Sequence, residues 1–110
     1  DRCAIPAAVW FEFLKGINVL PDGNRKECLK KFAYDIIQPA YPVIPYDDHC
    51  ASVHAEIFVA MQKMGLPVSQ LDMQIAATAI ANNMVIITGN TSRFEPILHE
   101  YSLQVENWFV

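Results

Sequence analysis

The pattern of apolar and polar residues predicts helices that alternate with short strands along the whole chain. Apolar residues recur at the spacing of one helix face in several segments. The predicted helices are 7–16, 24–37, 48–64 and 69–83, and the strand candidates are 3–6, 43–44, 84–88 and 103–108. The continuous apolar run at 84–88 is typical of a parallel strand covered on both faces. This alternation indicates an α/β layered sheet.

Capping and turn residues predict where several elements begin and end. Asp47 or Asp48 can cap the helix that follows it, and Gly65 can end that helix. Ser69 is expected to open the next helix, and residues 21–23 form a turn. Three prolines are expected to break any helix between residues 37 and 47: Pro39, Pro42 and Pro45.

Composition indicates one globular domain. A chain of 110 residues that is 53% hydrophobic can bury one core, and a charged fraction of 18% without low-complexity tracts disfavours extensive disorder. We expect no membrane segment and no signal peptide, because polar residues or prolines interrupt every apolar stretch. Cys3, Cys28 and Cys50 are widely spaced and odd in number, which favours a reducing cytoplasm over a disulfide framework.

The net charge of −4 argues against a protein that coats nucleic acid through many basic contacts. It does not argue against a nuclease, whose carboxylates hold a cation that supplies the positive charge for phosphate. The basic concentration at 25–31 fits the solvated side of a helix, with substrate contact as the alternative.

Two acidic residues stand out as candidates for metal chemistry. Glu12 is an isolated acid in an apolar helix and could instead lie on a solvated stripe near Lys15. Asp72 could close a capping box with Ser69, which would also suit the helix dipole. A capped helix start is also a rigid mount for a metal ligand, so the two interpretations of Asp72 are compatible.

Four segments together resemble a PIN domain of the VapC toxin type. They are 4–16, with its acidic residue ahead of a glycine, 71–79, 85–90 and 103–108. The resemblance implies a PIN-like three-layer α/β/α fold around a central parallel sheet, with residues 1–110 forming a single domain. It also implies a metal-dependent endoribonuclease that hydrolyses RNA with Mg²⁺ or Mn²⁺.

The resemblance also implies roles for individual residues. Glu12 and Asp72 would ligate the metal, while Asn90 and Thr88 would help to position water and phosphate. Asn90 could instead cap the helical turn 91–98. The implied partners are an RNA substrate, a small antitoxin that blocks the groove, and a second copy of the chain in a homodimer.

The sequence departs from the family pattern in two places. Arg93 occupies the position of a further acidic residue; it could contact phosphate or an acidic group of a partner, but a surface role is the favoured interpretation. The family's first strand, with the first catalytic Asp, has no counterpart here, so these residues alone are expected to have low or no activity. Two alternatives therefore remain: a catalytically degenerate interaction module, and a PIN nuclease outside toxin-antitoxin systems.

A zinc site is a weaker alternative. Cys50 and His54 are one helical turn apart, with His49 nearby, and this spacing can hold a transition metal. Such residues on a helix with an apolar stripe more often serve packing and the surface.

Overall fold

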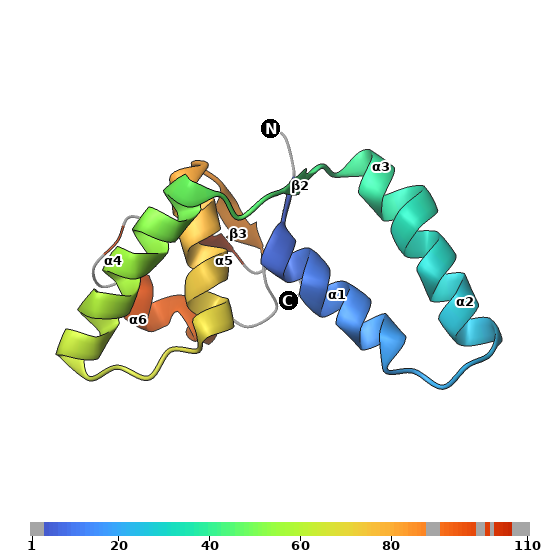
Figure 1. Ribbon diagram of the computed structural model, residues 1–110, viewed down its shortest axis with the longest axis horizontal. Helices are drawn as coiled ribbons and strands as arrows, with labels where there is room; N and C mark the ends of the chain where they lie inside the picture. Colours follow the sequence, from blue (N-terminus) through green and yellow to red (C-terminus); the bar gives the residue numbers. More distant parts are fainter. Residues whose placement is uncertain (1–3, 88–90, 99–100, 102, 107–110) are drawn as a thin grey trace. The chain divides into compact units, whose positions relative to one another are not determined.

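The computed structural model describes residues 4–87, 91–98, 101 and 103–106. The chain divides into two compact units, residues 1–45 and 46–110, and each has its own packing. The elements of both units are drawn in Figure 1. The single domain predicted for residues 1–110 stays a prediction.

The first unit begins with a strand that leads directly into a helix. Strand β1 (Ile5–Pro6) runs into α1 (Ala7–Asn18), and β1 pairs in parallel with β2 (Val43–Ile44). Between them lie α2 (Asn24–Lys31), the π-helix η1 (Phe32–Ile37) and α3 (Gln38–Ala40). The parallel pair confirms the predicted strands at both ends of this unit.

The predicted helix break at Pro39 is wrong. Helical structure continues through Pro39 to Ala40, the last residue of α3. Tyr41 then has extended backbone angles, φ −129° and ψ 109°, because the ring of a following proline disfavours the helical region for the residue before it. The proline that ends this helical segment is therefore Pro42.

The second unit pairs two helices with a short parallel ladder. Helix α4 (Asp48–Met64) and helix α5 (Gln70–Ala81) pack side by side (Figure 1). Strand β3 (Val85–Ile87) pairs in parallel with β4 (Gln104–Glu106). Two short helices, η2 (Thr91–Phe94) and α6 (Glu95–Leu98), lie between these strands in the chain. Parallel pairing in both ladders confirms the α/β class.

The predicted caps of α4 and α5 are confirmed. Asp47 accepts the backbone N–H of Cys50 at 3.0 Å, and Ser69 Oγ accepts the backbone N–H of Asp72 at 3.1 Å. Gly65 ends α4 with φ 66°, a left-handed conformation that glycine adopts without steric cost. The helix start that carries Asp72 is thus fixed by its own sequence.

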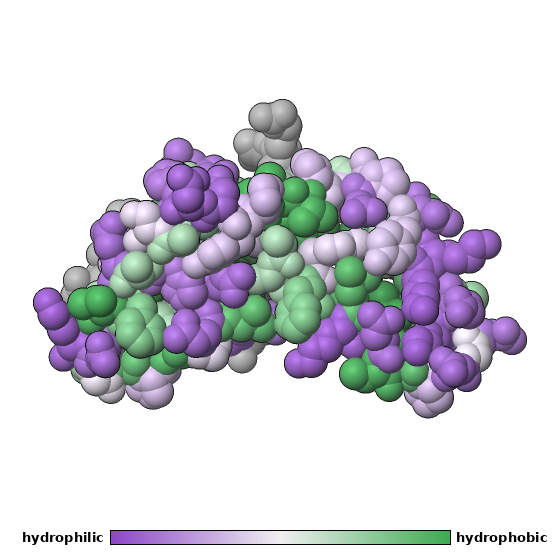
Figure 2. Space-filling view, in the orientation of Figure 1, coloured by the Kyte–Doolittle hydropathy of each residue, from purple (hydrophilic) through white to green (hydrophobic). Residues whose placement is uncertain are grey.

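The core of the second unit lies between its helices and the ladder. Its most enclosed large side chains are Ile57, Ile75, Ile97 and Phe94. On the face in view in Figure 2, polar and apolar residues lie in interspersed patches. Among the described residues, none of the helices is both long and apolar enough to cross a bilayer.

Candidate active site around Asp72

Asp72 is held at the start of a helix that is buried on nearly every side. It is the third residue of α5, one turn ahead of Ala76 and Ala77, both 0% exposed. Side chains this small let the backbone of α5 approach its neighbours closely. The Asp72 side chain itself is 15% exposed, so the helix presents it in a largely desolvated position.

Arg93 forms an ion pair with Asp72. Arg93 Nε donates to Asp72 Oδ1 at 3.0 Å, and Nη2 donates to the same oxygen. The two residues are 21 positions apart and come from different elements, η2 and α5. The sequence-based interpretation of Arg93 as a surface residue is therefore wrong: its side chain is 30% exposed and pairs with the candidate metal ligand.

The neighbour of Arg93 in the sequence anchors this ion pair. The Phe94 ring is 1% exposed, and the Arg93 guanidinium carbon lies 5.4 Å from its centroid. A cation over an aromatic face at this distance is attracted by the ring quadrupole. The buried Phe94 thus fixes the backbone next to Arg93, and the Arg93 side chain reaches Asp72 from there. Local periodicity could not have revealed this contact, although a cation at a position where the related pattern has an acid was a signal for it.

Glu12 lies in the other unit. It is half-buried on α1, whereas its neighbour Phe11 is 54% exposed. Lys15 Nζ lies 6.0 Å from the centroid of the Phe11 ring. An acid that is less exposed than the adjacent aromatic residue does not fit a simple solvated stripe. The convergence of Glu12 and Asp72 on one cation stays a prediction, since each unit is placed only by itself.

Two further predicted site residues, Thr88 and Asn90, lie outside the described residues. Their predicted roles in positioning water and phosphate, and the alternative role of Asn90 as a helix cap, stay predictions.

The donor atoms of the candidate site suit a hard divalent cation. Carboxylate oxygens are the preferred protein ligands of Mg²⁺ and Mn²⁺, and Asp72 presents one carboxylate on a rigid mount. Within the part of the chain that the structure describes, no three His, Cys, Asp or Glu residues are gathered closely enough to hold a metal. Asp72 therefore stands as a single candidate ligand here, and its sharing of a cation with Glu12 stays a prediction.

The residues of the zinc alternative are engaged in other contacts. Cys50 is completely buried, and Asn82 Nδ2 lies 3.8 Å from its sulfur. Both ring nitrogens of His54 are hydrogen-bonded, Nδ1 with the Tyr46 hydroxyl at 2.8 Å and Nε2 with Gln70 Oε1 at 3.1 Å. These contacts favour the packing and surface interpretation.

The Asp47 carboxylate interacts with the backbone at the start of α4. The Cys50 backbone N–H, which donates to its carboxylate, holds the pKa of Asp47 below its usual range. A carboxylate that accepts backbone N–H groups is stabilised in its charged form. This confirms that Asp47 caps α4.

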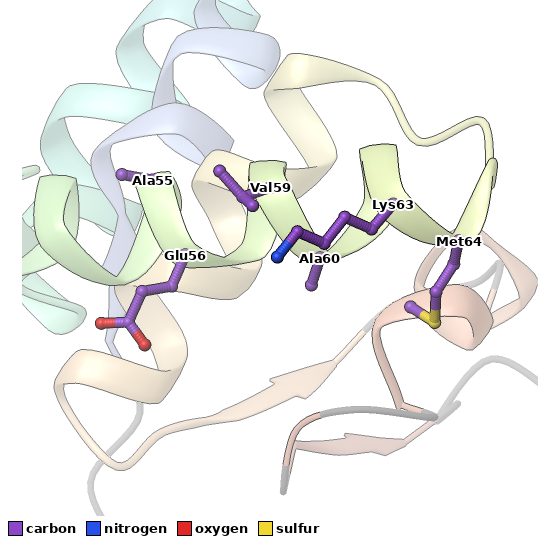
Figure 3. Close-up of a pocket in the computed structure, with 6 residues that line it drawn as sticks. All are labelled: Ala55, Glu56, Val59, Ala60, Lys63 and Met64. Carbon is purple, nitrogen blue, oxygen red and sulfur yellow. The ribbon is translucent and has the colours of Figure 1, made fainter.

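A shallow groove lies along α4, away from the carboxylate chemistry. Figure 3 shows its lining side chains, which all come from this one helix. They are Ala55, Glu56, Val59, Ala60, Lys63 and Met64. The lining is mainly apolar, with one acid and one base, and it contains no pair of carboxylates that could share a cation.

The chain is similar in sequence to a known protein family and to named relatives. Residues 1–96 match the PIN domain family. Over 98 residues the chain is 33% identical to the Ribonuclease VapC of Rickettsia bellii, covering 88% of this chain and 72% of the relative. Over 86 residues it is 31% identical to the plasmid stability protein StbB of Pseudomonas syringae, covering 76% of this chain and 62% of that protein.

A solved structure shows the same fold. The crystal structure of VapBC2 from Rickettsia felis, bound to a DNA fragment from its promoter, matches with a TM-score of 0.80 at 25% identity. The match covers 97% of this chain and 75% of the chain in that structure. These likenesses confirm the predicted PIN-like α/β fold and the resemblance to VapC proteins.

Proposed function

This chain belongs to the PIN domain family, and we propose that the full-length protein is a metal-dependent endoribonuclease, the toxin of a VapBC-type toxin-antitoxin pair. A relative that is 33% identical carries the name Ribonuclease VapC. The observation that carries the proposal is Asp72, a mostly buried carboxylate on a capped helix start. A group held in this way is a preorganised ligand for the cation that phosphodiester hydrolysis needs.

In this proposal Glu12 and Asp72 hold Mg²⁺ or Mn²⁺. The bound cation would neutralise the phosphate oxygens and lower the pKa of the attacking water. The Ser69 cap orients the backbone beneath Asp72, and the buried face of α5 keeps the helix from shifting. Asn90 and Thr88 would orient the water and the phosphate.

The proposed partners are RNA, a small antitoxin and a second copy of the chain. The antitoxin is supported by the related structure, which is a VapBC complex. Exposed apolar side chains such as Val59 and Met64 support a homodimer, because association removes such surface from water. The proposed location is the cytoplasm. Light scattering on the full-length protein, with and without its antitoxin, measures both assemblies, and a monomer at all concentrations would contradict the homodimer.

The decisive experiment compares RNA cleavage by the full-length protein with cleavage by its Asp72→Asn variant, each with Mn²⁺. We expect cleavage by the wild type and loss of cleavage in the variant, because the amide cannot supply a charged ligand. Circular dichroism spectra of the two proteins serve as the control for folding. Equal cleavage by both proteins, or cleavage by neither, would refute the proposed ribonuclease activity.

The second candidate is an interaction module whose site no longer binds metal. The Arg93–Asp72 ion pair favours it, since a guanidinium already neutralises the carboxylate. Mn²⁺ binding separates the two candidates: a degenerate module binds no Mn²⁺ through Asp72. A PIN nuclease outside toxin-antitoxin systems would cleave RNA but lack an antitoxin partner.

A further inference from the structure

The ion pair between Arg93 and Asp72 places a permanent positive charge on the carboxylate that a metal would need. Two Arg93 nitrogens, Nε and Nη2, donate hydrogen bonds to Asp72 Oδ1. A guanidinium stays protonated at all accessible pH values. Any divalent cation that reaches Asp72 therefore meets either an occupied oxygen or a neighbouring positive charge.

The surroundings strengthen this competition. The Asp72 side chain is 15% exposed and that of Arg93 30% exposed, so water screens the pair only in part. Phe94, which is buried, anchors the segment and limits how far the guanidinium can withdraw. A double and a single positive charge about 5 Å apart repel each other enough to weaken binding roughly tenfold, even at the dielectric constant of water.

We propose that Arg93 is an internal competitor of the divalent cation at Asp72. It holds the carboxylate in one orientation when no metal is present, and it lowers the affinity of the site for the metal. This inference rests on the proposed function in one respect, namely that Asp72 is a metal ligand. It makes Arg93 a positioning residue that sets the metal concentration at which the site fills.

The test measures Mn²⁺ affinity by isothermal titration calorimetry on the full-length protein without its antitoxin. Arg93→Gln removes the charge and keeps a polar side chain, and we expect it to bind Mn²⁺ about tenfold more tightly than the wild type. Arg93→Lys, which restores the charge, should return the affinity towards that of the wild type. Lys63→Gln is the matched control, because Lys63 is the only other Lys or Arg in residues 46–110 and lies in the α4 groove.

Thermal unfolding distinguishes this role from a purely structural one. Without metal, Arg93→Gln should melt at a lower temperature than the wild type because the ion pair is lost. With saturating Mn²⁺ the difference should shrink, since the cation takes over as the partner of Asp72. A structural residue would lower the melting temperature equally in both conditions.

A measurement on the wild type remains decisive if Arg93→Gln does not fold. Adding Mg²⁺ should shift the nuclear magnetic resonance signal of the Arg93 Nε–H group, and the Asp72→Asn variant should show no such shift. Three results would overturn the inference: unchanged or weaker Mn²⁺ binding by Arg93→Gln, an Arg93 signal that Mg²⁺ leaves unmoved, or full Mn²⁺ affinity in Asp72→Asn. Failure of the proposed function is seen separately, as Mn²⁺ binding without RNA cleavage.

Discussion

The close packing of α5 can be tested at Ala76, whose side chain is completely enclosed. Leucine and alanine have similar helix propensities, whereas glycine in a helix interior costs about 1 kcal/mol relative to alanine. On propensity alone, Ala76→Gly should therefore be more harmful than Ala76→Leu. In an enclosed site, however, the added carbons of leucine force neighbouring side chains apart, at a cost of about 1–3 kcal/mol.

We therefore expect Ala76→Leu to lower the free energy of unfolding by about 2 kcal/mol. Urea denaturation measures this change, and with a slope near 2 kcal/mol per molar the midpoint falls by about 1 M. Ala55 is the control, because it lies exposed on α4: there, leucine should change stability by less than about 0.5 kcal/mol and glycine should be the worse substitution. The order of the two substitutions should thus reverse between the sites.

The reasoning about α5 would be refuted if Ala76→Leu were as harmless as Ala55→Leu. A functional consequence should accompany the loss of stability. Asp72 lies one turn before Ala76 on the same helix, so a displaced helix moves the carboxylate as well. We expect RNA cleavage by Ala76→Leu to fall by more than its folded fraction does.

Three further predictions concern the helix ends. Gly65→Ala should destabilise the protein by about 1 kcal/mol, because φ at this position is 66°; an unchanged urea midpoint would contradict this. Ser69→Ala should lower the free energy of unfolding by about 1 kcal/mol. It should also reduce RNA cleavage, because the start of α5 that carries Asp72 loses its cap; normal cleavage would show that the cap does not position Asp72. The pKa of Asp47 is lowered by its hydrogen bonds with Cys50, so its stabilising effect is present above the unfolded pKa of about 4 and is lost on further acidification. The stability difference between wild type and Asp47→Ala should therefore be largest at neutral pH and shrink as the solution is acidified, and a difference that does not shrink in acid would exclude this cause.

The sequence was most informative where structure is determined by neighbouring residues. Gly65 and Ser69 are correctly predicted as caps, and Asp47 is one of the two residues predicted to cap α4, because each acts on backbone groups within a few positions of itself. The parallel strands followed from short apolar runs between helices. The sequence alone does not separate Pro39 from Pro42: Gln38 before Pro39 keeps helical backbone angles, whereas Tyr41 before Pro42 is extended.

The candidate site was predicted less completely, because its geometry depends on contacts between distant positions. The pattern around Asp72 predicts a metal ligand, which stays a prediction, whereas the prediction of a surface role for Arg93 is wrong because Arg93 pairs with Asp72. No local spacing reports a bond across 21 residues. Arg93 also stands where the family pattern has an acidic residue. A basic residue at this position fits an ion-pair partner of Asp72 rather than a simple loss of a metal ligand.

The two hydrogen bonds of the His54 ring form a chain in the second unit, in which each group donates to the next. Gln70 Oε1 can only accept, so Nε2 carries the hydrogen, and Nδ1 of the neutral ring accepts from the Tyr46 hydroxyl. The neutral imidazole is therefore restricted to one tautomer, with donation running from Tyr46 through His54 to the first residue of α5.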